Sequence, residues 1–80
     1  MVISGGENID QIEVVNAISS IAKFNKIIPF KKEDPYWGEV NGVYIYTNQK
    51  IEPGYIKSEL EKLISKYKIP KEIIIRKNIT

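Results

Sequence analysis

The chain has 80 residues and a formal net charge of +2, which limits it to one small domain with a marginal core. It contains neither cysteine nor histidine, so disulfides, thiolate metal sites and histidine-based catalytic pairs are excluded. The charge is too small to indicate nucleic acid, no apolar run approaches the ~20 residues of a membrane span, and no secretory signal is evident. We therefore expect a cytoplasmic globular domain with no nucleic-acid or membrane partner, either independent or part of a larger protein.

The first predicted element is a short strand at residues 2–4, followed by the adjacent glycines Gly5 and Gly6. Glycine adopts backbone conformations closed to other residues and lets another molecule approach the main chain closely. Glu7 and Asn8 then add side chains that form hydrogen bonds. Considered alone, this segment is a turn that leads from a strand into a helix.

A first helix is predicted at residues 10–22. Asp10 and Glu13 have the spacing of a capping box, with an acidic cap in place of serine or threonine. Ile12 and Val15 widen the apolar face, which predicts that the helix is covered on more than one side. The residues that recur at helical spacing on that face are Val14, Ala17, Ile18, Ile21 and Ala22.

The middle of the chain predicts two strands joined by a loop. Residues 24–30 form a short apolar run, and Pro29 places this strand at an edge or ends it, because proline has no N–H. Residues 31–39 are expected to form the loop. Residues 43–46 are β-branched or aromatic, which is typical of a strand.

A second helix is predicted from Pro53 to Tyr67, because proline suits the first turn of a helix. Pro70 ends this helix, and residues 72–76 read as a buried last strand. The apolar stripe of the helix contains Ile56, Leu60, Leu63, Ile64 and Tyr67. The opposite face predicts an ordinary solvated surface made of Lys57, Glu59, Glu61, Lys62 and Lys66.

The order of elements is thus β-α-β-β-α-β. It predicts a small α+β domain over residues 1–80, in which two helices pack on a short mixed sheet.

Three separated segments then carry a joint resemblance. They are residues 3–9 (Ile-Ser-Gly-Gly-Glu-Asn-Ile), 34–40 (Asp-Pro-Tyr-Trp-Gly-Glu-Val) and 67–71 (Tyr-Lys-Ile-Pro-Lys). In this order and on this framework, the chain resembles the C-terminal domain of the AMP-forming acyl-CoA synthetases, the adenylate-forming ligase superfamily. Glu13 and Val14 also fit the family's x-Glu-Val-Glu pattern. The resemblance covers essentially the whole chain.

The resemblance implies a ligase that works in two steps. A carboxylic acid reacts with Mg-ATP to give an acyl-adenylate and pyrophosphate, and the CoA thiol then displaces AMP. A large N-terminal domain, the expected partner, holds the acid and ATP, while the small C-terminal domain rotates between one pose for each step. CoA and Mg-ATP are therefore expected as substrates of the parent enzyme, with no tightly bound cofactor and no metal site in this domain.

Two family features are not found in this sequence. The family's hinge residue lies just before the position of Met1, and its Pro-x-Thr-x-x-Gly-Lys motif, whose lysine assists adenylation, lies beyond the last strand. Lys77 is no substitute, because it directly follows the strand and lacks the glycine context. We therefore expect a domain fragment that carries no catalytic residue and cannot adenylate an acid.

The same resemblance assigns the glycine segment to the pantetheine channel of the thioester-forming step. A slender arm that bears amides must lie against backbone, and glycine leaves no Cβ in its way. The alternative is a plain turn, with Glu7 and Asn8 capping the local backbone. The implied CoA-binding residues of this segment are Ser4, Gly5, Gly6, Glu7 and Asn8.

The other two segments are assigned to the nucleotide end of CoA. Trp37 lies in a predicted polar loop, an unusual place for a core residue, and in CoA ligases with an Asp-x-x-Trp-Gly motif that tryptophan can stack on the CoA adenine. Tyr67, Lys68 and Lys71 match the segment that contacts the nucleotide, where ammonium groups would offset phosphate charge. The alternative is that Tyr67 ends the core stripe and both lysines are solvated.

Within the superfamily, the motifs are most similar to those of stand-alone acid–CoA ligases, among them ligases of aryl acids, medium-chain acids and o-succinylbenzoate. The acid pocket lies in the N-terminal domain, so the acid itself is not predicted. A second hypothesis is a non-catalytic binding or docking module derived from this domain, which would occupy the cleft of a partner.

Overall fold

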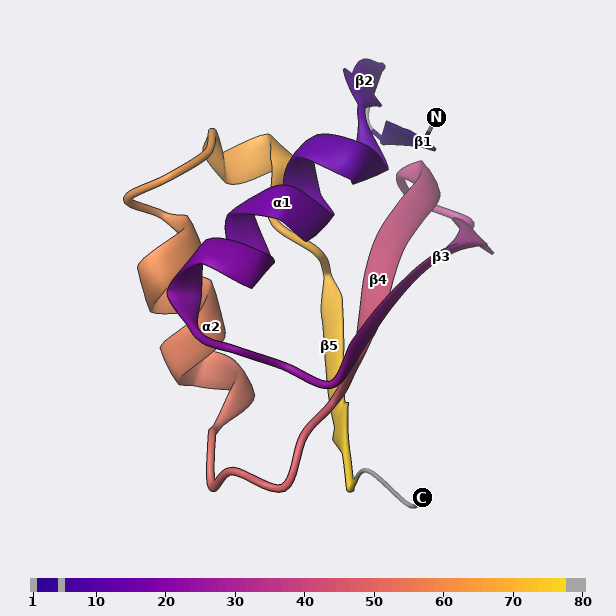
Figure 1. Ribbon diagram of the computed structural model, residues 1–80. Helices are drawn as coiled ribbons and strands as arrows, with labels where there is room; N and C mark the ends of the chain where they lie inside the picture. The colour runs from indigo at the N-terminus through magenta and orange to yellow at the C-terminus, as the bar shows by residue number, and fades with distance from the viewer. Residues whose placement is uncertain (1, 5, 78–80) are drawn as a thin grey trace.

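A five-stranded mixed sheet forms one layer of the fold (Figure 1). The computed structural model describes residues 2–4 and 6–77. The central strand is β4 (Gly38–Tyr46), which pairs antiparallel with β3 (Lys26–Asp34) along its whole length. On the other side of β4, β5 (Glu72–Arg76) runs parallel to it. The predicted mixed sheet is therefore confirmed.

The glycine segment forms a β-hairpin rather than a turn into a helix. β1 (Val2–Ser4) pairs antiparallel with β2 (Glu7–Ile9), and Gly6 between them has φ +84°, a left-handed conformation that suits glycine. Ile9 is fully buried while Asn8 before it is exposed, so the segment has the alternation of a strand. The chain thus contains one strand that the sequence did not predict.

Two α-helices, α1 (Gln11–Ile21) and α2 (Pro53–Leu60), cover the same face of the sheet (Figure 1). Asp10 caps α1 by accepting a hydrogen bond from the backbone N–H of Ile12 at 2.9 Å, as its position predicts. Glu13 does not complete the capping box and instead pairs with Lys68. Ile12 is 72% exposed, so the expected cover on a second side of this helix is wrong there.

The second helix is shorter than its apolar stripe predicts. It begins at Pro53 as expected, but it ends at Leu60, and after a turn the chain forms a 3₁₀ segment, η1 (Lys66–Lys68). The stripe is not buried along its length, because Leu63 and Tyr67 remain 51% and 42% exposed. Beyond the helix, residues 68–71 return to the sheet, where Asn41 holds them through hydrogen bonds with Lys68 and Lys71.

The core lies between the helices and the sheet. The buried core residues are Ile9, Val14, Ile18, Val43, Ile45, Ile56, Leu60 and Ile73. No helix in the described part of the chain is long and apolar enough to cross a membrane.

β3 is an edge strand, which confirms the interpretation of Pro29. It runs on to Asp34, however, and leaves only a short turn where a loop of residues 31–39 was expected.

Candidate functional site

The three segments that carry the resemblance meet at one end of the sheet. The hairpin joins β4 because Ser4 pairs with Gly38, and Gly38 directly follows Trp37 in the sequence. The ammonium of Lys71 lies 4.7 Å from the centre of the Trp37 ring. β2 also lies against η1. The structure therefore gathers residues from both ends and the middle of the chain into one surface.

Trp37 is held out on the β3–β4 turn and takes no part in the core. One carboxylate oxygen of Asp34 accepts hydrogen bonds from the backbone N–H groups of Tyr36 and Trp37, at 2.8 and 2.9 Å. Gly38 then turns the chain into β4 with φ +89°. Trp37 is 42% exposed, and the Tyr36 ring stands nearly perpendicular to the Trp37 ring, with 4.8 Å between the two centroids. This arrangement supports a flat aromatic surface next to solvent.

The Asp34 carboxylate makes this turn sensitive to acid. The hydrogen bonds from Trp37 and Tyr36 hold the pKa of Asp34 below its ordinary value of 3.8. Because the folded pKa is lowered, the stabilisation is fully present at neutral pH and is lost as the pH falls below 3.8, through the folded pKa. We expect Trp37 fluorescence to change in that acidic window. Asp34→Asn keeps the acceptor oxygen but cannot titrate, so the variant should not show this acidic change in fluorescence. If the variant and the unmodified chain had the same pH profile, the role of Asp34 would be contradicted.

Lys71 stands over the Trp37 ring, where an ammonium is attracted to the aromatic face by roughly 0.5–1 kcal/mol at an exposed site. Its backbone N–H donates to the carbonyl of Asn41 at 2.9 Å, which fixes where the side chain begins. A cation beside an exposed aromatic surface can bind a ligand that joins a flat ring to a phosphate. Trp37 and Lys71 are thus two predicted site residues that lie far apart in the sequence and contact each other in the structure.

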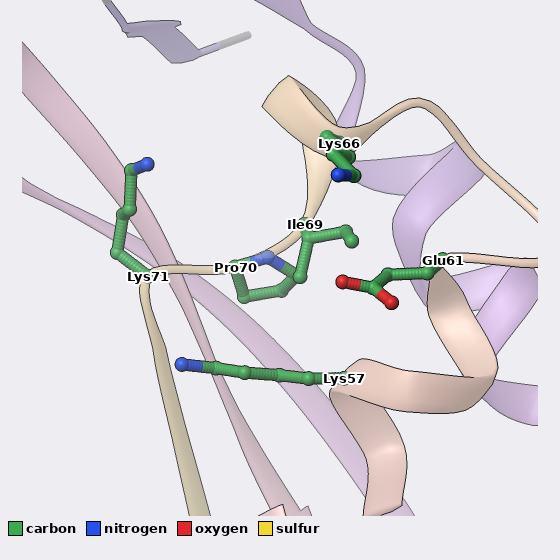
Figure 2. Close-up of a pocket in the computed structure, with 6 residues that line it drawn as sticks. All are labelled: Lys57, Glu61, Lys66, Ile69, Pro70 and Lys71. Atoms are coloured by element: carbon green, nitrogen blue, oxygen red, sulfur yellow. The ribbon is translucent and has the colours of Figure 1, made fainter. Parts of the chain in front are cut away.

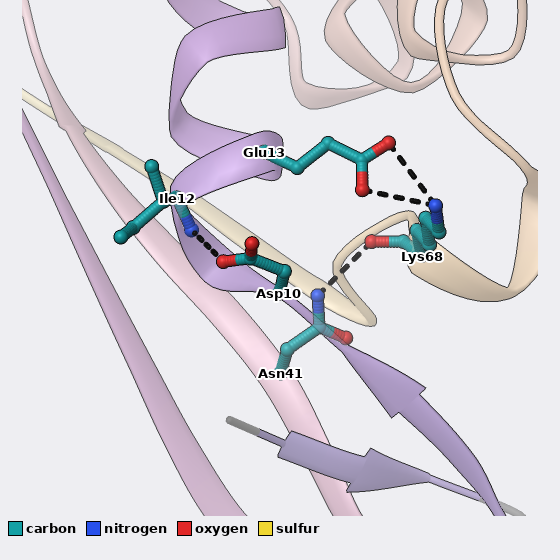
Figure 3. Close-up of polar contacts among 5 residues, drawn as sticks. All are labelled: Asp10, Ile12, Glu13, Asn41 and Lys68. Atoms are coloured by element: carbon teal, nitrogen blue, oxygen red, sulfur yellow. Dashed lines mark hydrogen bonds and ion pairs between the residues drawn. The ribbon is translucent and has the colours of Figure 1, made fainter.

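Lys68 is engaged in a different contact. Its ammonium donates to both carboxylate oxygens of Glu13, at 2.9 and 3.1 Å (Figure 3). The hydrogen bond to Glu13 raises the pKa of Lys68, so its charge is retained. An ammonium has three donors, and two contacts with Glu13 leave one for a phosphate. Tyr67, beside it, is 42% exposed and lies 5.7 Å from the same ammonium.

The hairpin presents backbone rather than side chains at its turn. A Cβ built on Gly6 would have no described neighbour within 4 Å, so its main chain faces open space. The Asn8 side chain is exposed, whereas the structure places Ser4 and Glu7 only by their backbone in β1 and β2. Gly5 lies outside the described residues. The turn can therefore accept a close approach by a ligand.

Asn41 is a residue of this region that the sequence analysis missed. It is 1% exposed, its side-chain amide donates to the Lys68 carbonyl at 3.1 Å (Figure 3), and its own carbonyl accepts from the Lys71 N–H. It therefore holds residues 68–71 against β4. A polar residue inside a strand that otherwise faces the core is the signal that could have revealed it.

The surface of the described residues has two hollows of different size. One, of about 210 Å³, adjoins Lys71 (Figure 2). The other, of about 440 Å³, lies beyond the C-terminal end of α1 and is lined by Ala22, Gln49, Lys50, Ile51, Glu52 and Tyr55. Among residues 2–4 and 6–77, no three acidic side chains gather into a metal site.

Known proteins are similar to this chain in sequence and in fold. Over 75 residues, 94% of its length, the chain is 32% identical to the 2-succinylbenzoate–CoA ligase of Listeria innocua, yet it spans only 16% of that enzyme. The fold matches a fatty acyl CoA synthetase from Mycobacterium tuberculosis with a TM-score of 0.89 and 26% identity, over 100% of the chain and 16% of that enzyme. No protein-family model matches the chain.

A third similar protein was solved with a bound molecule. A double mutant of o-succinylbenzoate CoA synthetase from Bacillus subtilis, solved with its product analogue OSB-NCoA, matches 98% of this chain and 16% of its own, with a TM-score of 0.86 and 28% identity. Sequence and fold thus agree over nearly the whole chain. The chain belongs to the family formed by the C-terminal domains of the AMP-forming acyl-CoA synthetases.

Proposed function

We propose that this domain is the mobile part of an acid–CoA ligase and lines the channel for CoA and its pantetheine arm during thioester formation. The observation that carries the proposal is the exposed pair of Trp37 and Lys71, placed at the same end of the sheet as the glycine hairpin. The similar Bacillus subtilis enzyme, crystallised with a CoA-type product analogue, supports it.

Trp37 and the lysines suit the nucleotide end of CoA. An adenine stacked on Trp37 would gain roughly 1–3 kcal/mol, by analogy with base stacking on aromatic side chains. The Lys71 ammonium beside the ring offsets the negative charge of the attached phosphates. Lys68 and Tyr67 precede Lys71 by three and four residues and extend the same surface. The Lys68 ammonium would then contact both Glu13 and the ligand.

The hairpin suits the pantetheine arm. The arm is narrow and carries two amide groups, which need backbone donors and acceptors more than side chains. Gly6 offers main chain without a neighbouring side chain in the way. Ser4, Gly5, Glu7 and Asn8 belong to this channel by the same proposal, and the hairpin would enter the active site only in the pose for the second step.

The acid, Mg-ATP and the catalytic groups belong to the remainder of the ligase in this proposal. The chain is similar both to a 2-succinylbenzoate–CoA ligase and to a fatty acyl CoA synthetase, whose acids differ. In this proposal the residues of this domain bind CoA and do not determine which acid the ligase uses. The partner of the domain is the large N-terminal domain of the same ligase.

The isolated chain allows a first test of CoA binding. Because only part of the channel is present, we expect weak affinity, near millimolar or about −4 kcal/mol. Trp37 fluorescence should respond to CoA more than to pantetheine, and less at high salt, because the nucleotide end carries the phosphates. Lys71→Gln should weaken the response, while Lys50→Gln, the same charge change in the other hollow, should not. Equal responses to CoA and pantetheine would place the contact elsewhere.

A further inference from the structure

The smaller hollow is sized for a single chemical group. It lies between the second half of α2 and the segment after η1, and its volume is about 210 Å³ (Figure 2). Pockets that enclose a whole small molecule begin at ~300 Å³, so this one suits part of a larger ligand. The residues that line it are Lys57, Glu61, Lys66, Ile69, Pro70 and Lys71.

The lining is rich in ammonium groups that have no ion-pair partner. Figure 2 shows Lys57 below Pro70 and Lys66 above Ile69, and the Glu61 carboxylate lies between the levels of these two lining side chains. Within the described residues, neither lysine has a carboxylate oxygen within 4.0 Å, whereas Lys62 nearby is paired with Glu59 at 2.9 Å. Unpaired cations that outnumber carboxylates around a small hollow favour an anionic group such as phosphate.

The hollow also has a defined position relative to the CoA surface. Lys71 lines it and at the same time stands over Trp37, and Trp37 adjoins Gly38, which pairs with the hairpin. Contacts therefore lead from the hairpin through Trp37 to Lys71 and then to the hollow. If adenine stacks on Trp37 and the pantetheine arm runs to the hairpin, the diphosphate leads toward the hairpin. The phosphate that remains free to reach the hollow is the one on the ribose.

We propose that Lys57 and Lys66 form a subsite for the ribose 3′-phosphate of CoA, an inference that rests on the proposed function above. The subsite distinguishes CoA from dephospho-CoA, which keeps the diphosphate but lacks this group. Glu61 opposes the phosphate and tempers the affinity. Lys57 and Lys66, which the sequence indicates as part of an ordinary solvated surface of the predicted second helix, thereby gain a role in substrate selection.

The test compares CoA with dephospho-CoA on the 80-residue chain, followed by Trp37 fluorescence at low salt. Two exposed charge contacts predict that CoA binds about three- to tenfold more tightly than dephospho-CoA. The double variant Lys57→Gln, Lys66→Gln should bring this ratio near one and leave dephospho-CoA binding within about twofold. Glu61→Gln should raise the ratio, and Lys50→Gln, in the other hollow, should leave it unchanged.

The outcomes separate the two proposals. A ratio near one in the unmodified chain, with Trp37 responding to both ligands, overturns the subsite and leaves the CoA surface intact. Equal weakening of both ligands in the double variant would assign the lysines to the diphosphate instead. If Trp37 responds to neither ligand, the CoA surface itself is wrong. Titration with adenosine 3′,5′-bisphosphate, read from the NMR signals of Lys57 and Lys66, then decides whether the hollow binds phosphate at all.

Discussion

Replacing Gly6 by leucine is expected to slow thioester formation by about tenfold or more, a barrier increase of at least ~1.4 kcal/mol, and to leave acyl-adenylate formation within roughly threefold. The reason is that the hairpin would line the pantetheine channel only in the second pose. A hybrid ligase provides the assay: this chain replaces the matching region of the Bacillus subtilis o-succinylbenzoate CoA synthetase, and the two half-reactions are measured separately.

A second substitution separates a blocked channel from a strained turn. Gly6 has φ +84°, so leucine also strains the backbone there, whereas asparagine tolerates this left-handed conformation. If obstruction is the cause, Gly6→Asn should also slow thioester formation selectively. Full recovery with asparagine, or equal loss in both half-reactions with leucine, would mean that Gly6 serves only the turn. A hybrid that cannot form thioester at all would favour a non-catalytic docking module.

Leu60→Ala is expected to lower the free energy of unfolding by about 2–5 kcal/mol, because it leaves a cavity in the core. Leu60 is fully buried, and a domain this small has only about 4–12 kcal/mol to lose. Leu63→Ala is the matched control: the same side chain is removed where it is 51% exposed, so the loss should be well under half as large. Urea unfolding followed by circular dichroism measures both. Similar losses would mean that the second helix continues through Leu63, as its stripe predicts.

Local signals in the sequence located most of the elements correctly. Asp10 caps the first helix, Pro53 begins the second, and the run of isoleucines between Glu72 and Arg76 forms a strand. Each signal acts through neighbouring residues: a side-chain acceptor for a free N–H, a fixed φ, or a β-branched run. Such interactions do not depend on the rest of the fold.

The misses concern elements whose ends are set by distant contacts. β2 exists because β1 pairs with both it and Gly38 of β4, a contact that the glycine segment alone does not reveal. The second helix ends at Leu60, and the segment that follows is fixed against the sheet by Asn41, a residue 27 positions before Lys68 in the sequence. β3 and β4 extend over charged residues because each supplies the hydrogen bonds of the other, regardless of side-chain polarity.

The candidate site divides in the same way. The residue types at Trp37 and Lys71 indicate aromatic and cationic chemistry, but only the sheet topology brings them to 4.7 Å from each other. The pairing of Lys68 with Glu13 joins an η1 residue to the first helix, so sequence spacing could not predict it. Lys57 and Lys66 look like surface residues because their hollow exists only after the chain turns back at Ile69 and Pro70.

The most direct test of the CoA surface is an NMR titration of the ¹⁵N-labelled chain with CoA at about millimolar concentration. The account predicts signal changes at Gly6, at the indole N–H of Trp37 and at Lys71, with Ala22 and Tyr55 of the larger hollow unaffected. Changes confined to Ala22 and Tyr55, with Trp37 and Lys71 unmoved, would contradict it.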